Sequence, residues 1–247
     1  MTKRIKESTK GRGFMAGKMS KSRAASAMSV LAARFAFVSS AVALALLTSL
    51  HFLKPELDPS WRMLSEYAIG DFGWVMQAAF IAMALGAVGS FFAVRPYLST
   101  RFGKIGSLFL LATAFGLTMA AFFTVDPITT PVEESTVEGI FHGLAAAIGM
   151  PSLPIAAFLV GRELLASRAW VAARRPILVA ANLPWISVVL MFTVLGIGFL
   201  QNEWKFGSDV LIGWPNRFLM LTYATWFMTI AYFCGLKGLQ QKSRKSR

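Results

Sequence analysis

The stretch HFLKPELDPSWRMLSEYAIGDFG, residues 51–73, decides the fold of this chain, because it is a polar segment enclosed between two long apolar runs. It places an imidazole, several carboxylates, a guanidinium and a serine in one short connection. Apolar runs of this kind cross a bilayer, so both ends of the connection are expected at the same membrane face. Its polar side chains must then lie at that face or just inside it.

Six apolar runs make up most of the sequence. A hydrocarbon core about 30 Å thick requires about 20 apolar residues per helix. The runs that meet this need are 35–52, 72–94, 105–125, 140–160, 177–200 and 218–236. The chain is 55% hydrophobic and only 15% charged, whereas soluble domains are about one quarter charged. None of the runs alternates as a membrane β-strand does. The sequence therefore predicts an all-α fold, a polytopic membrane bundle of six transmembrane helices.

Basic residues predict the orientation of this bundle. Most of the 25 lysines and arginines lie at the two ends of the chain and in the connections after the second and fourth runs. By the positive-inside rule, both termini are expected in the cytoplasm. The net charge of +13 then indicates topology and not nucleic-acid binding. The expected partners are membrane lipids, with anionic headgroups attracted to the cytoplasmic side.

The two ends of the chain differ from the apolar part in composition. Residues 1–29 are rich in Lys, Arg, Ser and Gly, which is typical of a disordered basic cytoplasmic arm. Residues 30–236 form the predicted transmembrane domain, and residues 237–247 form a basic cytoplasmic tail.

Small residues and prolines mark where helices are expected to meet or bend. The second run carries Gly89 and the third Gly116, each in a spacing of small residues that lets a neighbouring helix approach closely. The fourth run contains Pro151 and Pro154, and the fifth contains Pro184. Each proline removes one backbone hydrogen bond, so the carbonyl that it frees needs another donor.

Polar side chains from five segments are expected to meet at the outer face. They are His51, Asp58, Ser65, Glu66, Asp126, His142 and Arg217. Ionisable groups at the edge of the hydrocarbon usually face the interior of a bundle and are functional candidates. The sequence therefore predicts an outward-facing polar pocket that these residues line.

A metal site is one chemistry that this set permits. The two histidines with Asp126 or Asp58 would supply the two imidazoles and one carboxylate of a catalytic zinc site, leaving a position for water. Zinc bound by His51, His142 and Asp126 would make the protein a lipid amidase or esterase at the outer leaflet. The spacing matches no HxxxH, HExxH or CxxC motif. Haem between the two histidines fits less well, because axial ligands usually lie within helices.

A structural role is the alternative for the same residues. Arg217 then pairs with Asp126 or Glu66, the histidines bond to acidic neighbours, and the cluster fixes the order of the helices. Ser65 is not surrounded by the GxSxG motif of a serine nucleophile. It would instead be the N-cap of a helix with Glu66 in its first turn.

The function favoured by these observations is not enzymatic. It is recognition of a lipid headgroup or a small polar ligand, or an interaction role in the envelope. A metal-dependent lipid hydrolase and a small-solute transporter are the alternatives, the latter favoured by the proline breaks in the fourth and fifth runs.

Several segments together carry a resemblance to a known family. The run SEYAIGDFGWVMQAAF (65–80) resembles the segment that opens the second span in the bacterial family catalogued as domain of unknown function 998. His51 resembles a histidine at the end of that family's first span. The stretch TVDPITTPVEESTVEGIFHGLAAA (124–147) is similar to its acidic loop and following histidine, and WPNRFLMLTYATWF (214–227) to the entry of its last span. The resemblance covers about residues 30–236 and implies a six-span protein of the bacterial inner membrane with no assigned activity.

Overall fold

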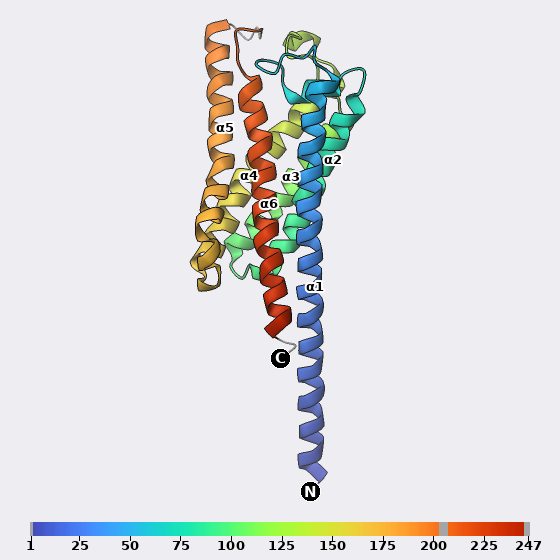
Figure 1. The fold of residues 1–247 in the computed structure, drawn as a ribbon, viewed down its shortest axis with the longest axis vertical. Coiled ribbons are helices and arrows are strands. Elements are labelled where there is room, and N and C mark those ends of the chain that lie inside the picture. Colours follow the sequence, from blue (N-terminus) through green and yellow to red (C-terminus); the bar gives the residue numbers. More distant parts are fainter. Residues whose placement is uncertain (1, 203–206, 245–247) are drawn as a thin grey trace.

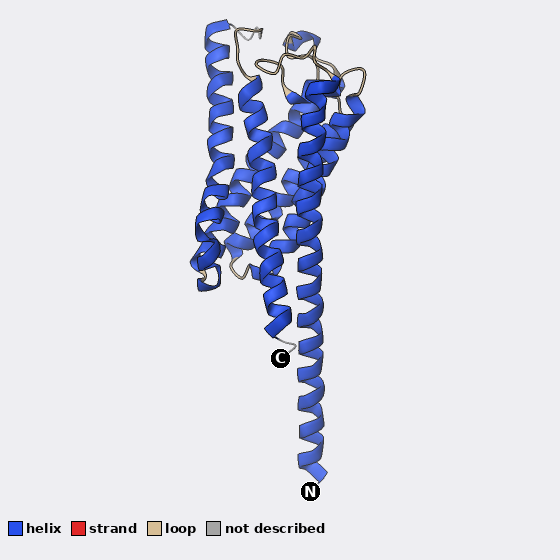
Figure 2. Cartoon of the chain, viewed as in Figure 1, coloured by secondary structure: helices blue, strands red, loops and turns tan. Residues whose placement is uncertain are grey.

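The computed structural model describes the backbone of residues 2–202 and 207–244, and the side chains of residues 27–198, 200 and 207–240. All regular structure in these residues is helical (Figure 2). The long helices are α1 (Thr2–Leu53), α2 (Gly73–Val94), α3 (Arg101–Phe122), α4 (Val137–Ala166), α5 (Arg174–Asn202) and α6 (Gly213–Arg244). The short 3-10 helices of the connections are η1 (Leu64–Ala68), η2 (Arg95–Tyr97), η3 (Val132–Glu134) and η4 (Arg168–Ala173).

Within the described residues, six helical segments are long and apolar enough to cross a membrane. They are Ala27–Leu53, Gly73–Tyr97, Arg101–Phe122, Val137–Ala166, Arg168–Gly198 and Gly213–Gln240. The predicted all-α architecture with six spans is therefore confirmed. The domain limits predicted near residues 29 and 237 stay predictions, because side chains 1–26 and 241–247 lie outside the described set.

The helices pack in the order in which they occur in the chain. Each long helix contacts the next one, and α6 returns to pack against both α1 and α2, which closes the bundle. The first residues of α1 and the last residues of α6 lie at the same end of the molecule, the lower end in Figure 1. The opposite end, here called the distal end, carries the connection between α1 and α2 and the connection between α3 and α4 (Figure 1).

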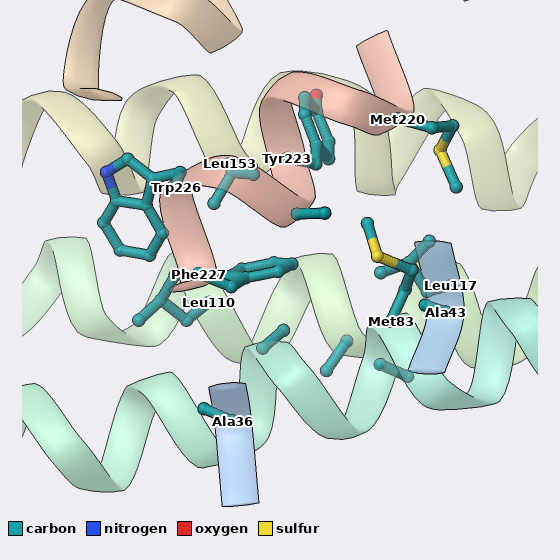
Figure 3. Packing of buried hydrophobic residues seen from close by; sticks show 14 of the residues in the cluster. Ala36, Ala43, Met83, Leu110, Leu117, Leu153, Met220, Tyr223, Trp226 and Phe227 are labelled. Atoms are coloured by element: carbon teal, nitrogen blue, oxygen red, sulfur yellow. The ribbon is translucent and has the colours of Figure 1, made fainter. Parts of the chain in front are cut away.

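Small residues hold the closest helix pairs together, as their spacing predicts. A Cβ atom on Gly89 of α2 would lie 2.9 Å from the Cβ atom of Ala36 on α1, and one on Gly116 of α3 would lie 2.7 Å from the Cα atom of Gly149 on α4. Larger side chains fill the centre of the bundle around these crossings, and Trp226 and Phe227 of α6 are fully buried there (Figure 3).

The outer faces of the helices carry large apolar side chains. Phe115 of α3 is 57% exposed, and on α5 Val189 and Phe192 are 60% and 54% exposed. Such surfaces are disfavoured in water but match the hydrocarbon core of a bilayer, so the exposed faces agree with six membrane-crossing helices.

One carbonyl that a proline of α4 leaves free accepts a hydrogen bond from a side chain of another helix. Pro154 has no N–H to donate to the carbonyl of Met150, four residues earlier. The hydroxyl of Tyr223 on α6 donates to that carbonyl instead. The prediction that freed carbonyls need partners is therefore confirmed at this position, and α4 and α6 are joined in the middle of the bundle.

Candidate functional site

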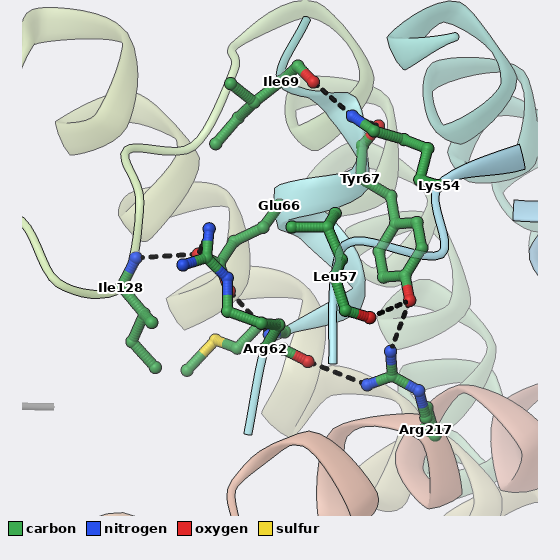
Figure 4. A network of polar contacts seen from close by, with 9 residues as sticks. Lys54, Leu57, Arg62, Glu66, Tyr67, Ile69, Ile128 and Arg217 are labelled. Carbon is green, nitrogen blue, oxygen red and sulfur yellow. Dashed lines mark hydrogen bonds and ion pairs between the residues drawn. The ribbon is translucent and has the colours of Figure 1, made fainter. Parts of the chain in front are cut away.

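A buried carboxylate organises the distal end. Glu66 of η1 is 1% exposed, and its oxygens accept hydrogen bonds from the backbone N–H of Met63 at 2.7 Å and of Ile128 at 3.0 Å (Figure 4). The guanidinium of Arg62, one turn earlier, forms an ion pair with it at 3.0 Å. Because Ile128 lies in the connection between α3 and α4, Glu66 joins the two distal connections. The N-cap of η1 is Met63 and not Ser65, so the predicted capping role of Ser65 is wrong.

The guanidinium of Arg217 binds uncharged acceptors only. From the first turn of α6, its Nε donates to Nε2 of His51 at 2.9 Å, its Nη1 to the carbonyl of Arg62 at 2.8 Å, and its Nη2 to the hydroxyl of Tyr67 at 3.1 Å. Nη1 also donates to the carbonyl of Gly213 at 3.1 Å. The predicted pairing of Arg217 with Asp126 or Glu66 is wrong. Glu66 forms its ion pair with Arg62, four residues earlier in the chain. Asp126 accepts hydrogen bonds from Thr136.

The ring of His51 is held at both nitrogens. Its Nδ1 lies 2.9 Å from the carbonyl of Leu47, which can only accept a hydrogen bond, so the proton must be on Nδ1. Its Nε2 is then the acceptor for Arg217. His51 is therefore a neutral imidazole in the Nδ1–H tautomer, and both of its nitrogens are satisfied by protein groups.

Two further residues of the same network are not among the predicted site residues. Tyr67 is fully buried, accepts from Arg217 and donates to the carbonyl of Leu57 at 3.0 Å (Figure 4). Lys54 is 5% exposed, and its ammonium group donates to the carbonyls of Tyr67 and Ile69 (Figure 4). A lysine next to a proline, and an aromatic residue beside an acid, are common in exposed loops, so composition alone gives no signal for their burial.

The ring of His142 is held at one nitrogen only. His142 lies on the second turn of α4 and is 6% exposed. Its Nδ1 lies 2.8 Å from the carbonyl of Phe123, so Nδ1 carries the proton and donates. The ring also makes an edge contact with Phe80, with centroids 5.9 Å apart. The carbonyl of Ala120 is a second backbone acceptor beside the ring. The apolar surroundings disfavour a charged ring, so Nε2 keeps a lone pair, for which no donor lies among the described side chains.

His142 borders a cavity of about 230 Å³ in the distal half of the bundle. The cavity lies between η1, α2, α3, α4 and α6, with Met191 of α5 on its wall. Five of its lining residues are methionines, and none is Asp, Glu, Lys or Arg. Its polar lining groups are the side chains of Ser65, His142, Asn216 and Tyr223. The cavity is therefore largely apolar, in contrast to the polar pocket predicted from the sequence.

Asp126 and Asp58 shape the backbone outside the cavity. Asp126 accepts from the backbone N–H and hydroxyl of Thr136, the N-cap of α4, at 2.9 and 2.8 Å. Glu163 binds Thr100, the N-cap of α3, with the same pair of contacts at the other end of the bundle. Asp58 is exposed, and hydrogen bonds from the hydroxyl and the N–H of Ser60 hold its pKa below its ordinary value.

The seven predicted residues are thus divided among separate places. Ser65 and His142 line the cavity, His51 and Arg217 form a network at the end of α1, and the three carboxylates hold connections and helix ends. The three predicted zinc ligands are not brought together. Across the described part of the chain, no group of three His, Cys, Asp or Glu residues is arranged to hold a metal ion.

Six apolar helices with a polar network at one end define a multi-pass membrane protein. The chain belongs to the family described as Protein of unknown function (DUF998), which matches residues 24–232. The family membership indicated by the residue patterns is therefore confirmed. No curated protein and no solved structure matches the chain.

Proposed function

We propose that this protein binds an uncharged amphiphilic molecule of the membrane in the cavity beside His142. The observation that carries the proposal is the free Nε2 lone pair of a buried imidazole whose other nitrogen is fixed by the carbonyl of Phe123. A fixed acceptor facing an apolar cavity selects a ligand that donates a hydrogen bond at this point, such as a hydroxyl or an amide.

Other polar groups of the cavity suit the same ligand. The side-chain oxygen of Asn216 accepts from the N–H of Leu64 at 2.8 Å, which leaves its amide hydrogens available as donors. The hydroxyl of Ser65 has no partner within the described residues and can donate or accept. A headgroup with both donors and acceptors therefore matches the cavity.

The walls argue against a charged headgroup. No Asp, Glu, Lys or Arg lines the cavity, and a charge transferred to an apolar site without a partner is strongly disfavoured. Small-molecule sites are commonly about 300–1,000 Å³, and this cavity is about 230 Å³. It suits a neutral headgroup with the first part of one acyl chain.

A ligand can approach this cavity from the side of α4. Gly139 and Gly143 line it; Gly143 is exposed at the surface and Gly139 is partly exposed. A Cβ atom at Gly143 would meet no atom within 4 Å, so a larger side chain there can extend across the opening without disturbing the backbone.

The proposal is tested by native mass spectrometry of the detergent-solubilised protein with 1-oleoylglycerol as the probe. We expect Gly143→Trp to abolish retention of the probe, and His142→Phe to weaken it about tenfold by removing the acceptor. Gly196→Trp is the matched control, since a Cβ atom on this α5 glycine also meets open space. Equal retention by wild type and Gly143→Trp, or binding of oleoyl phosphate that Gly143→Trp abolishes, would overturn the proposal.

The zinc hydrolase and transporter alternatives have less support. The predicted zinc ligands have separate partners in the fold. The prolines of α4 favoured a transporter, but the carbonyl that Pro154 leaves free accepts a hydrogen bond from Tyr223 inside the bundle.

We also propose that both termini are cytoplasmic and that the distal end faces away from the cytoplasm, in a bacterial inner membrane. Basic residues gather at the end of the bundle that holds both termini, where they would attract anionic headgroups. Labelling of single cysteines in a Cys234→Ser background tests this orientation. A cysteine at exposed Glu133 should react with an impermeant reagent from outside, and one at Arg168 should not; the reverse result would overturn it.

A further inference from the structure

We propose that a groove between α1 and α6 binds the anionic headgroup of a membrane phospholipid at Arg217. This groove, here called the α1/α6 groove, lies at the distal end and has a volume of about 340 Å³. Its residues include Leu44, Thr48, His51, Phe52, Arg217 and Leu221. Leu64 and Met220 line both this groove and the cavity beside His142. The proposal rests on a different observation, the charge of Arg217.

The charge of Arg217 has no carboxylate in direct contact, and Asp58 and Glu66 act on it only through space. The only ion pair between described side chains joins Arg62 to Glu66. The four groups that Arg217 contacts are two carbonyls, a hydroxyl and a neutral imidazole. These contacts satisfy donors but leave a full positive charge in a partly desolvated place, which favours an anion nearby.

The guanidinium also has a donor to spare. Its five N–H groups make four hydrogen bonds within the protein, and the unused one is on Nη2. The contacts with His51, Tyr67 and the Arg62 carbonyl fix the plane of the group. Arg217 therefore presents one oriented N–H and its charge, as a phosphate oxygen requires.

The surroundings of Arg217 favour a phospholipid over a free phosphate ion. Phe52 is 80% exposed and Leu221 49% exposed, and both border the groove together with Leu44 and exposed Thr48. Arg217 lies in the first turn of α6 and His51 in the last turn of α1, at the level where a span ends and headgroups begin. Acyl chains can then follow the apolar walls towards the bilayer centre while the phosphate stays at Arg217.

The test is a substitution that fills the groove without touching the network. Thr48→Trp places a large side chain in the groove, and Thr193→Trp on α5 is the matched control. Both threonines are exposed, and both hydroxyls donate at 2.8 Å to the carbonyl four residues earlier. Binding of phosphatidylglycerol and of phosphatidylcholine with identical chains is measured by native mass spectrometry of the full chain.

We expect wild type and Thr193→Trp to prefer phosphatidylglycerol, and Thr48→Trp to bind it about tenfold less tightly. The preference should weaken as salt rises from about 0.1 M to about 1 M, because the Debye length falls from about 10 Å to about 3 Å. Inorganic phosphate should not displace the lipid.

Three results would overturn the proposal. They are unchanged phosphatidylglycerol binding in Thr48→Trp, displacement of the lipid by inorganic phosphate, and a change from dimer to monomer in Thr48→Trp with lipid binding intact. The last result would assign the groove to a second copy of the chain.

Discussion

The two histidines of this protein lie in opposite chemical settings, although both are neutral and both donate from Nδ1 to a backbone carbonyl. His51 belongs to a network in which Arg217 occupies its second nitrogen. His142 has a free second nitrogen beside an apolar cavity. An imidazole that the protein satisfies at both nitrogens holds structure together, whereas one that it satisfies at a single nitrogen is preorganised for a ligand.

The same contrast separates the two regions around these rings. The network at the end of α1 combines Arg62, Glu66, Tyr67 and Arg217 into a set of contacts that ties the first distal connection to α6. No Asp, Glu, Lys or Arg side chain lines the cavity. Stability is therefore expected to depend on the first region, and selection of the uncharged ligand on the second.

The largest loss of stability is expected for Glu66→Gln. It removes the charge that balances Arg62 and leaves a partly buried guanidinium, 19% exposed, without its ion-pair partner. Breaking a fully buried pair costs about 3–5 kcal/mol, and partial exposure lowers this to about 2–3 kcal/mol. Thermal unfolding in detergent measures the effect. Glu134→Gln, at an exposed position of η3, is the control, and an equal loss in both variants would contradict the role of Glu66.

A smaller difference is expected between His51→Phe and His142→Phe. The first leaves Nε of Arg217 without its acceptor, which should cost about 1–3 kcal/mol. The second frees only the carbonyl of Phe123, and the new ring packs beside Phe80, so the cost should stay below about 1 kcal/mol. Unfolding midpoints of the two variants, measured side by side, check the order. Greater destabilisation by His142→Phe would reverse the comparison.

The hydroxyl of Tyr223 is expected to contribute about 1 kcal/mol at the cavity wall. Tyr223→Phe leaves the carbonyl of Met150 without a donor, because Pro154 cannot supply one. Tyr232→Phe is the matched control on the same helix, at a position that is 54% exposed. If both variants unfold at the same temperature as wild type, the proposed link between α4 and α6 does not contribute.

The smallest effect is expected at Asp58, on the exposed edge of the network. Hydrogen bonds from Ser60 lower the pKa of Asp58 in the folded chain below its ordinary value of 3.8. Its ionised form therefore adds stability that is fully present above pH 3.8 and is lost as the pH falls through the lowered pKa. The difference in unfolding temperature between wild type and Asp58→Asn should be constant near neutral pH and shrink in acid. A difference that grows in acid would contradict this assignment.

The fold could be predicted from the sequence because hydrophobic length alone identifies a membrane span. Glycine spacing likewise indicated where α3 crosses α4. The partners of the polar groups could not be predicted in the same way, because they depend on distances of a few ångströms between segments. Arg217 lies more than a hundred residues from Glu66 in the chain, while Arg62 is one turn away and reaches that carboxylate first.

Only part of the candidate site could be predicted for the same reason. The rarity of histidine and its position at helix ends identified His51 and His142. Which of the two keeps a free nitrogen depends on the first turn of α6, where Arg217 meets His51. The apolar cavity is formed by methionines and small residues, which in the sequence are indistinguishable from ordinary packing residues.

Nitrogen-15 NMR of the histidine side chains tests the central claim most directly, since the chain has only two histidines. His51→Gln and His142→Gln assign the two sets of imidazole signals. Both rings should be neutral with the proton on Nδ1. On addition of 1-oleoylglycerol, the Nε2 signal of His142 should shift towards a hydrogen-bonded value, while that of His51 stays unchanged. A shift at His51 alone, or no shift at either ring with the lipid bound, would contradict the claim that the free nitrogen of His142 defines the ligand site.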